Sequence, residues 1–271
     1  MPELPEVETT LRGISSHIDQ CRVKKINIYQ EKLRWPIEKK LHSKLSGKQL
    51  LKLQRRGKYL ILDFKKGSLL IHLGMSGSLR ILDSNISLEK HDHFEIIFDN
   101  NKTLRLRDPR RFGAVIWTEE NWQDHKLIKS LGPEPLTDEF NTEYLHEASR
   151  KKSSAVKSFI MDSHIVVGVG NIYASEALFR AGIHPTRAAK RISKKRFENL
   201  VTAIKTVLEK AINEGGTTLK DFTNAEGKPG YFTQQLNVYG KANQPCPTCS
   251  TPIKHKVIAQ RATYYCSHCQ H

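Results

Sequence analysis

Four cysteines near the end of the chain are spaced as metal ligands. Cys246 and Cys249 form one Cys-x-x-Cys pair, Cys266 and Cys269 form a second pair, and residues 250–265 separate the two. Two such pairs bind zinc tetrahedrally through thiolates, in a site that is closed to substrate and therefore structural. A short terminal segment with few apolar residues also needs a metal to fold. We expect one structural Zn²⁺, held by all four thiolates.

The amino terminus offers a different kind of reactive group. Pro2 follows Met1, and removal of Met1 would leave the proline nitrogen as a free secondary amine. An α-amino group has a pKa of about 8, against about 10.4 for lysine, so far more of it is neutral at pH 7. Such an amine could attack the anomeric carbon of a sugar, and the adjacent Glu3 could act as general acid or base. The alternative is that Pro2 and Glu3 simply precede a helix.

The charge balance indicates a polyanionic partner. The chain has 44 Lys and Arg against 28 Asp and Glu, which gives a net charge of +16. Nucleic acid is favoured, because its phosphates bind basic surfaces whatever the base sequence. A membrane partner is disfavoured, since we find no signal sequence, no spanning apolar run and no basic amphipathic helix. We expect a cytoplasmic monomer with reduced cysteines and, in the absence of a Walker motif, no nucleotide cofactor.

The hydrophobic pattern predicts an α+β fold in three parts. A helix over residues 5–18 precedes a strand-rich region, and a helical region begins after the break at residues 132–135. We expect a β-sandwich with a flanking helix at 1–132, a helical domain at 133–240 and a cysteine-rich β-hairpin unit at 241–271. The expected strands are 23–29, 49–54, 59–64, 68–73, 94–98, 103–107 and 114–118, and the expected helices are 142–150, 155–161, 172–181 and 194–214.

Several short motifs occur together in a fixed order. They are PELPEVE at 2–8, RGKYL at 56–60, HLGMSG at 72–77, KHDH at 90–93, DPRRFG at 108–113 and GVGNIY at 168–173, followed by the four-cysteine tail. With these motifs the chain resembles formamidopyrimidine-DNA glycosylase over essentially its whole length. The resemblance implies a helix–two-turns–helix element within 133–240 and a zinc finger on the β-hairpin. It also implies a bacterial enzyme that meets its substrate on the nucleoid.

The resemblance implies a bifunctional glycosylase/AP lyase of base excision repair. Such an enzyme removes 8-oxoguanine and formamidopyrimidines from damaged double-stranded DNA through a proline Schiff base, then cuts the strand by β,δ-elimination. Pro2 would be the nucleophile and Glu3 would protonate the opening sugar. Lys58 would serve β-elimination and Arg261 δ-elimination. Because a guanidinium is a poor proton donor, we expect Arg261 also to position phosphate. Without the resemblance, Lys58 would be interpreted as a surface lysine.

An enzyme that acts on a stacked base must extrude it and fill the gap. The resemblance assigns this filling to Met75, Arg110 and Phe112, with Arg110 reading the orphaned cytosine. The alternative is that Met75 and Phe112 belong to the core. The residues expected to contact the DNA backbone are His91, Lys151, Lys157 and Asn171. The residues expected to cap the flipped base lie within 217–240 and include Thr217, Thr218, Lys220, Gly227, Tyr231 and Phe232.

Two other functions fit part of the pattern. One is an endonuclease VIII-like glycosylase that removes oxidised pyrimidines, although the PELPEVE start favours the purine enzyme. The other is a zinc-ribbon protein that binds DNA or RNA without catalysis, which charge and cysteines fit equally well. Covalent trapping on damaged DNA separates the enzymes from the binding protein.

Overall fold

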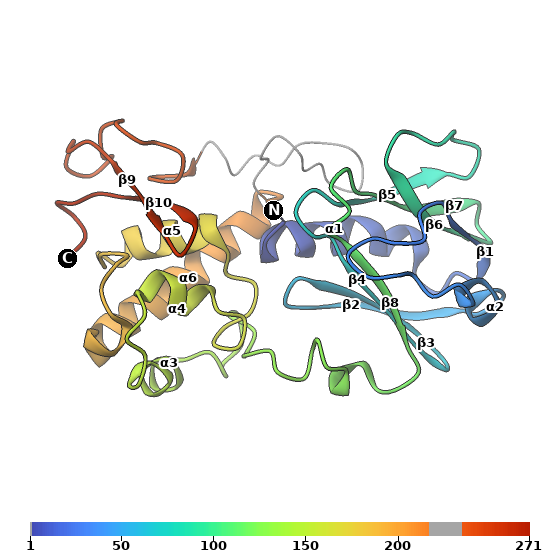
Figure 1. Cartoon of the computed structure of the whole chain (residues 1–271), viewed down its shortest axis with the longest axis horizontal. Helices are drawn as coiled ribbons and strands as arrows, with labels where there is room; N and C mark the ends of the chain where they lie inside the picture. Colours follow the sequence, from blue (N-terminus) through green and yellow to red (C-terminus); the bar gives the residue numbers. More distant parts are fainter. Residues whose placement is uncertain (1, 217–234) are drawn as a thin grey trace. The chain divides into compact units, whose positions relative to one another are not determined.

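The computed structural model describes residues 2–216 and 235–271. The chain forms two compact units, shown with their elements in Figure 1. Unit 1 comprises Met1–Ser130 and Glu214–Thr233, and unit 2 comprises Leu131–Asn213 and Gln234–His271. Among the described residues, no helix is long and apolar enough to cross a membrane. Of the expected base-capping loop at 217–240, residues 217–234 lie outside the described part of the chain.

Unit 1 is built on two four-stranded antiparallel sheets, with strand orders β1-β6-β7-β5 and β2-β3-β4-β8. Buried apolar side chains from both sheets and from the first helix form one core cluster. The strands are β1 (Val23–Ile28), β2 (Leu50–Arg56), β3 (Tyr59–Phe64), β4 (Gly67–His72), β5 (Ser78–Asp83), β6 (Asp92–Phe98), β7 (Lys102–Arg107) and β8 (Ala114–Thr118). The helical elements are α1 (Leu4–Ile18), α2 (Leu41–Leu45) and the 3₁₀ turn η1 (Trp122–Asp124).

Helix α1 forms because its sequence carries both a start signal and a buried apolar face. Glu3 is the N-cap residue and makes a reciprocal capping box with Glu6, while a proline occupies the first turn. Val7, Ile14 and Ile18 are fully buried against the sheets. This packing fixes the position of α1, and it therefore also fixes the position of the residues directly before the helix.

Unit 2 combines the helical region with the cysteine-rich hairpin. Its elements are α3 (Thr142–Ser149), α4 (Val156–Met161), α5 (Asn171–Arg180), η2 (Ala189–Arg191), α6 (Lys194–Asn213), β9 (Lys254–Ile258) and β10 (Arg261–Tyr265). The side-chain amide of Gln270 donates to the carbonyl of Ile183 at 2.9 Å, and the backbone of His271 donates to Gly182 at 3.0 Å. The hairpin therefore packs on the helices, although the sequence pattern treats it as a separate part.

The expected architecture is confirmed, and its element boundaries move by a few residues. Apart from the two short 3₁₀ turns, one strand and one helix were missed. Strand β5 (Ser78–Asp83) continues from a glycine-containing loop and has three polar residues among its six, so its alternation is weak. Helix α2 (Leu41–Leu45) has five residues and buries only Leu41 and Leu45, which is too short for a helical period to be recognised.

Candidate active site

The amino-terminal residues are held at the start of α1. Pro2 is buried, and Glu3 is 2% exposed. The backbone N–H of Glu3 donates to Oε2 of Glu6 at 2.8 Å, which is one half of the capping box. Glu3 thus lies at the positive end of the helix dipole, where a carboxylate is stabilised. The capping box therefore gives Pro2 and Glu3 a defined position.

Lys58 lies in the two-residue turn between β2 and β3, where Arg56 pairs with Tyr59 and Gly57 has a φ of 56°. The expected strand at 59–64 also places Lys58 directly before its first residue. Arg55 anchors this turn: its Nη1 donates to the carbonyl of Gly57 at 2.9 Å, and its Nε donates to Glu8 of α1 at 2.8 Å. The Arg55–Glu8 ion pair therefore ties the turn that carries Lys58 to the helix that carries Glu3.

His72 is a site residue to which the sequence analysis gave no role. Its ring lies 4.8 Å from the ring of Tyr59, and its Nδ1 accepts the N–H of Gly74 at 2.9 Å. Burial is the main cause that lowers the pKa of His72 to about 4, and the charges of Lys58 and Arg34 lower it further. The imidazole is therefore neutral at physiological pH. In that form it can keep accepting the Gly74 N–H, which holds the loop before Met75.

The three residues expected to fill the DNA gap lie on two neighbouring loops of unit 1. Phe112 is 44% exposed and Met75 is half-buried, so Phe112 is not a core residue. The guanidinium of Arg110 lies 5.0 Å from the centre of the Phe112 ring. A Cβ on Gly74, whose φ is +65°, would lie 2.4 Å from the backbone carbon of Phe112. The loops thus meet backbone to backbone, where only glycine fits.

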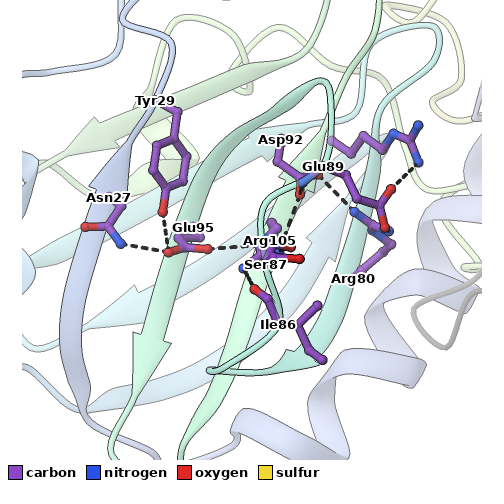
Figure 2. A network of polar contacts seen from close by, with 10 residues as sticks. Asn27, Tyr29, Arg80, Ile86, Ser87, Glu89, Asp92, Glu95 and Arg105 are labelled. Carbon is purple, nitrogen blue, oxygen red and sulfur yellow. Dashed lines mark hydrogen bonds and ion pairs between the residues drawn. The ribbon is translucent and has the colours of Figure 1, made fainter.

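A buried polar network, shown in Figure 2, supports the loop that joins β5 to β6 and contains His91. Arg105 is 3% exposed and donates to the backbone carbonyls of Ile86 and Ser87, each at 2.9 Å. It also donates to Glu95 at 2.9 Å and to Asp92 at 3.4 Å. Burial and the hydrogen bond with Glu95 raise the pKa of Tyr29 to about 12, so its hydroxyl remains a donor. The network therefore holds the loop in place from its buried side. Within this loop His91 has a φ of 76°.

In unit 2, Lys157 and Asn171 meet at the start of α5. Nζ of Lys157 donates to Asn171 Oδ1 at 2.6 Å, to the Ala262 carbonyl at 3.0 Å and to the Thr263 hydroxyl at 2.9 Å. Lys157 is 1% exposed, so within this structure its ammonium binds protein oxygens rather than facing solvent. Lys151 and Arg261 are exposed. The phosphate contacts expected of these residues stay predictions.

The four cysteine sulfurs converge as the spacing predicted. All four lie within 4.8 Å of one another. The sulfurs of Cys249 and Cys266 are 3.5 Å apart, and those of Cys246 and Cys269 are 3.9 Å apart. Thiolates about 2.3 Å from a tetrahedral zinc ion lie at comparable separations. The backbone N–H of Thr248 donates to the Cys246 sulfur at 3.4 Å. Hydrogen bonds of this kind orient the ligands of a metal site. The residues therefore fit one structural Zn²⁺.

Comparison with known proteins decides what these parts form together. Family models match as the formamidopyrimidine-DNA glycosylase N-terminal domain at residues 1–115, its H2TH domain at 131–223, and the zinc finger found in FPG and IleRS at 243–271. The chain belongs to the formamidopyrimidine-DNA glycosylase family. Formamidopyrimidine-DNA glycosylases of Saccharophagus degradans and Teredinibacter turnerae are 54% and 55% identical to it, over 100% of both chains in each pair.

Solved structures of the family share the whole fold. MutM from Thermus thermophilus superimposes with a TM-score of 0.89 at 33% identity, covering 99% of this chain and 98% of that one. The Lactococcus lactis enzyme in complex with DNA containing N7-benzyl-Fapy-dG gives a TM-score of 0.92 at 32% identity, with 99% of both chains covered. Family membership makes this chain a DNA-repair glycosylase with AP lyase activity and a zinc finger.

Proposed function

We propose that this formamidopyrimidine-DNA glycosylase excises oxidised purines from duplex DNA with the Pro2 nitrogen as nucleophile. The observation that carries the proposal is the position of Pro2 directly before a buried, helix-capping Glu3. After Met1 is removed, the amine lone pair attacks C1′ of the damaged nucleotide. The bond from C1′ to the base breaks, and the base leaves with a proton. Glu3 donates a proton to the ring oxygen as the sugar opens, and an iminium remains between C1′ and Pro2.

The iminium then drives strand cleavage, because it withdraws electrons from the neighbouring carbon. Loss of a C2′ proton expels the 3′ phosphate, and a second elimination expels the 5′ phosphate. Lys58 is the proposed proton carrier of the first elimination, and Arg261 serves the second while it holds phosphate. The ion pair between Arg55 and Glu8 supports the proposal for Lys58, since it fixes the Lys58 turn to α1. Arg261 begins β10 and its side chain is exposed.

Exposure and charge support the proposed DNA contacts. Met75, Arg110 and Phe112 would enter the gap left by the flipped nucleotide, with Phe112 as an apolar wedge. Arg110 would donate to the acceptor edge of the opposite cytosine. His91 and Lys151 would contact phosphates directly, whereas Lys157 would act through Asn171, whose amide it holds. The proposed parts are 1–132 for chemistry, 133–240 for the helical DNA contact and 241–271 for the zinc finger. In a bacterial cell the enzyme would work in the cytoplasm, on the nucleoid.

Borohydride trapping tests the proposal directly. Reduction of the iminium should link the wild-type protein to duplex DNA carrying 8-oxoguanine, and Pro2→Gly should lose this product while still binding the duplex. Lys152→Ala is a suitable control, because Lys152 is exposed and has no proposed role. Binding without trapping would leave a non-catalytic DNA-binding protein. Faster trapping on thymine glycol than on 8-oxoguanine would instead indicate pyrimidine specificity.

A further inference from the structure

The hydroxyl group of Ser76 connects the two loops that carry the proposed gap-filling residues. It donates to Oδ1 of Asp108 at 2.9 Å and accepts the backbone N–H of Arg110 at 3.2 Å. Ser76 is 6% exposed, and Asp108 is fully buried. A buried hydroxyl that is both donor and acceptor has a defined orientation, so this contact sets the distance between the loops.

Asp108 extends the connection beyond Ser76. Its Oδ2 accepts the backbone N–H of Gly113 at 2.7 Å, so the carboxylate closes the loop that begins at Asp108 and contains Arg110 and Phe112. Its own backbone N–H donates to the carbonyl of His91 at 3.0 Å. The side chain and the backbone of one buried residue therefore link the segment around Met75, the segment around Arg110 and the end of the His91 loop.

The carboxylate makes these bonds with neutral donors, and no described cation lies within ion-pair distance of it. Apolar side chains could also hold two loops together, and they cost less free energy to bury than a carboxylate. Directional hydrogen bonds instead fix the relative positions of the three loop segments.

We infer that Ser76 and Asp108 are positioning residues that hold Met75, Arg110 and Phe112 as one preformed unit. The inference rests on the proposed function, in which these three side chains occupy the gap in the DNA. A preformed unit places the Arg110 guanidinium at the edge of the opposite base without first ordering a loop, which strengthens its discrimination. Ser76 and Asp108 thereby determine opposite-base specificity without touching DNA.

Removal of the Ser76 hydroxyl tests this inference. The measurement is the ratio of single-turnover excision rates for 8-oxoguanine opposite cytosine and opposite adenine. A loss of folded enzyme lowers both rates together, so only misplacement of Arg110 changes the ratio. Ser76→Ala should reduce the ratio by about fivefold to tenfold, the lower range of what a base-edge hydrogen bond contributes. Ser76→Thr keeps the hydroxyl and should restore most of the ratio.

Ser68→Ala is the matched control. Ser68 is also 6% exposed, and its hydroxyl also donates to a carboxylate, that of Asp63 at 2.6 Å, but it lies in β4 away from both loops. The ratio of excision rates opposite cytosine and opposite adenine should be the same for Ser68→Ala as for the wild type. A double mutant of Ser76→Ala with Arg110→Ala should show no further loss beyond Arg110→Ala, because the hydroxyl acts through that arginine.

The outcomes distinguish failure of the proposed function from failure of this inference. If the wild type shows no trapping on damaged DNA, the proposed function fails and the ratio has no meaning. If the wild type traps and Ser76→Ala retains its full cytosine preference, the inference is overturned. Should Ser76→Ala prove unfolded at the assay temperature, Ser76→Cys keeps nearly the same volume with weaker hydrogen bonds, and it must shift the ratio in the same direction.

Discussion

Nζ of Lys157 and Oδ1 of Asn171 lie 2.6 Å apart, which joins α4 to the first residue of α5. The same ammonium donates to the carbonyl of Ala262, the residue after Arg261, and Asn171 Nδ2 donates to that carbonyl as well, each at 3.0 Å. The buried side chain of Lys157 and the half-buried side chain of Asn171 therefore hold the start of β10. Their arrangement gives the hairpin a fixed seat on the helices of unit 2, and it sets the backbone from which Arg261 projects.

Lys157→Met should lower the free energy of unfolding by about 1–3 kcal/mol. Methionine keeps the volume of the side chain but removes the ammonium donor from Asn171 Oδ1 and from the Thr263 hydroxyl, and a buried unsatisfied group is destabilising. We also expect a higher proportion of β-elimination over β,δ-elimination product, since Arg261 loses its support. Urea unfolding and gel analysis of the cleaved strand measure the two effects. Lys152→Met is the exposed control; equal urea midpoints for all three proteins would contradict the prediction.

Between pH 7.5 and pH 5, His72 should lower the free energy of unfolding by about 2 kcal/mol. Its pKa is about 4 in the folded protein, against about 6.5 when unfolded. Between these values the unfolded chain binds a proton that the folded protein does not, so stability falls as pH falls and is level above about 6.5.

The variant His72→Asn isolates this contribution. An asparagine oxygen can still accept the Gly74 N–H, but the side chain does not titrate. The difference in unfolding free energy between wild type and variant should therefore shrink or change sign on going from pH 7.5 to pH 5. His125 and His184, whose pKa values are also lowered by burial, are present in both proteins and cancel in the comparison. A constant difference over this pH range would show that His72 is not buried in neutral form.

Much of the fold followed from local sequence signals, whereas the contacts of the site did not. The apolar face of α1 and the Cys-x-x-Cys pairs have fixed spacings along the chain, so their geometry is set by neighbours a few residues away. Ser76 and Asp108 are far apart in sequence, and nothing in either local pattern indicates that they bond. Lys157 was expected from the resemblance to contact phosphate, and its hydrogen bond to β10, which lies beyond the helices along the chain, has no signal in the local pattern. Such pairings depend on tertiary packing.

Arg55→Met should slow β-elimination more than base excision. Arg55 is largely buried and donates both to Glu8 and to the carbonyl of Gly57, next to Lys58. Without it the turn loses its anchor to α1, and Lys58 no longer has a fixed position. Arg12→Met is the matched control, because Arg12 pairs with the same carboxylate at 3.0 Å while its side chain is 62% exposed. Exposed pairs of this kind contribute about 0.5 kcal/mol.

Cleavage of a preformed abasic site measures elimination without the excision step. We expect Arg55→Met to reduce this rate at least about fivefold, whereas Arg12→Met should remain close to the wild type. Burial by itself would raise the pKa of Glu8, but the hydrogen bonds and charges of Arg55 and Arg12 outweigh it and lower that pKa. The ion pair therefore persists at the pH of the assay. Equal rates for the two variants would mean that the Lys58 turn is positioned without Arg55.

Loss of one zinc ligand should release the metal and disrupt the hairpin, whereas substitution of Cys21 should affect neither. Cys249→Ser removes one of the four converging ligands, and structural zinc in such sites contributes on the order of 10 kcal/mol to folding of the segment. We expect the variant to lose its bound zinc and at least about tenfold in affinity for duplex DNA. Cys21→Ser is the matched control, because Cys21 lies in unit 1 outside the cluster. It should retain one zinc per chain by elemental analysis. Full zinc content in Cys249→Ser would show that the metal is not held by this thiolate set.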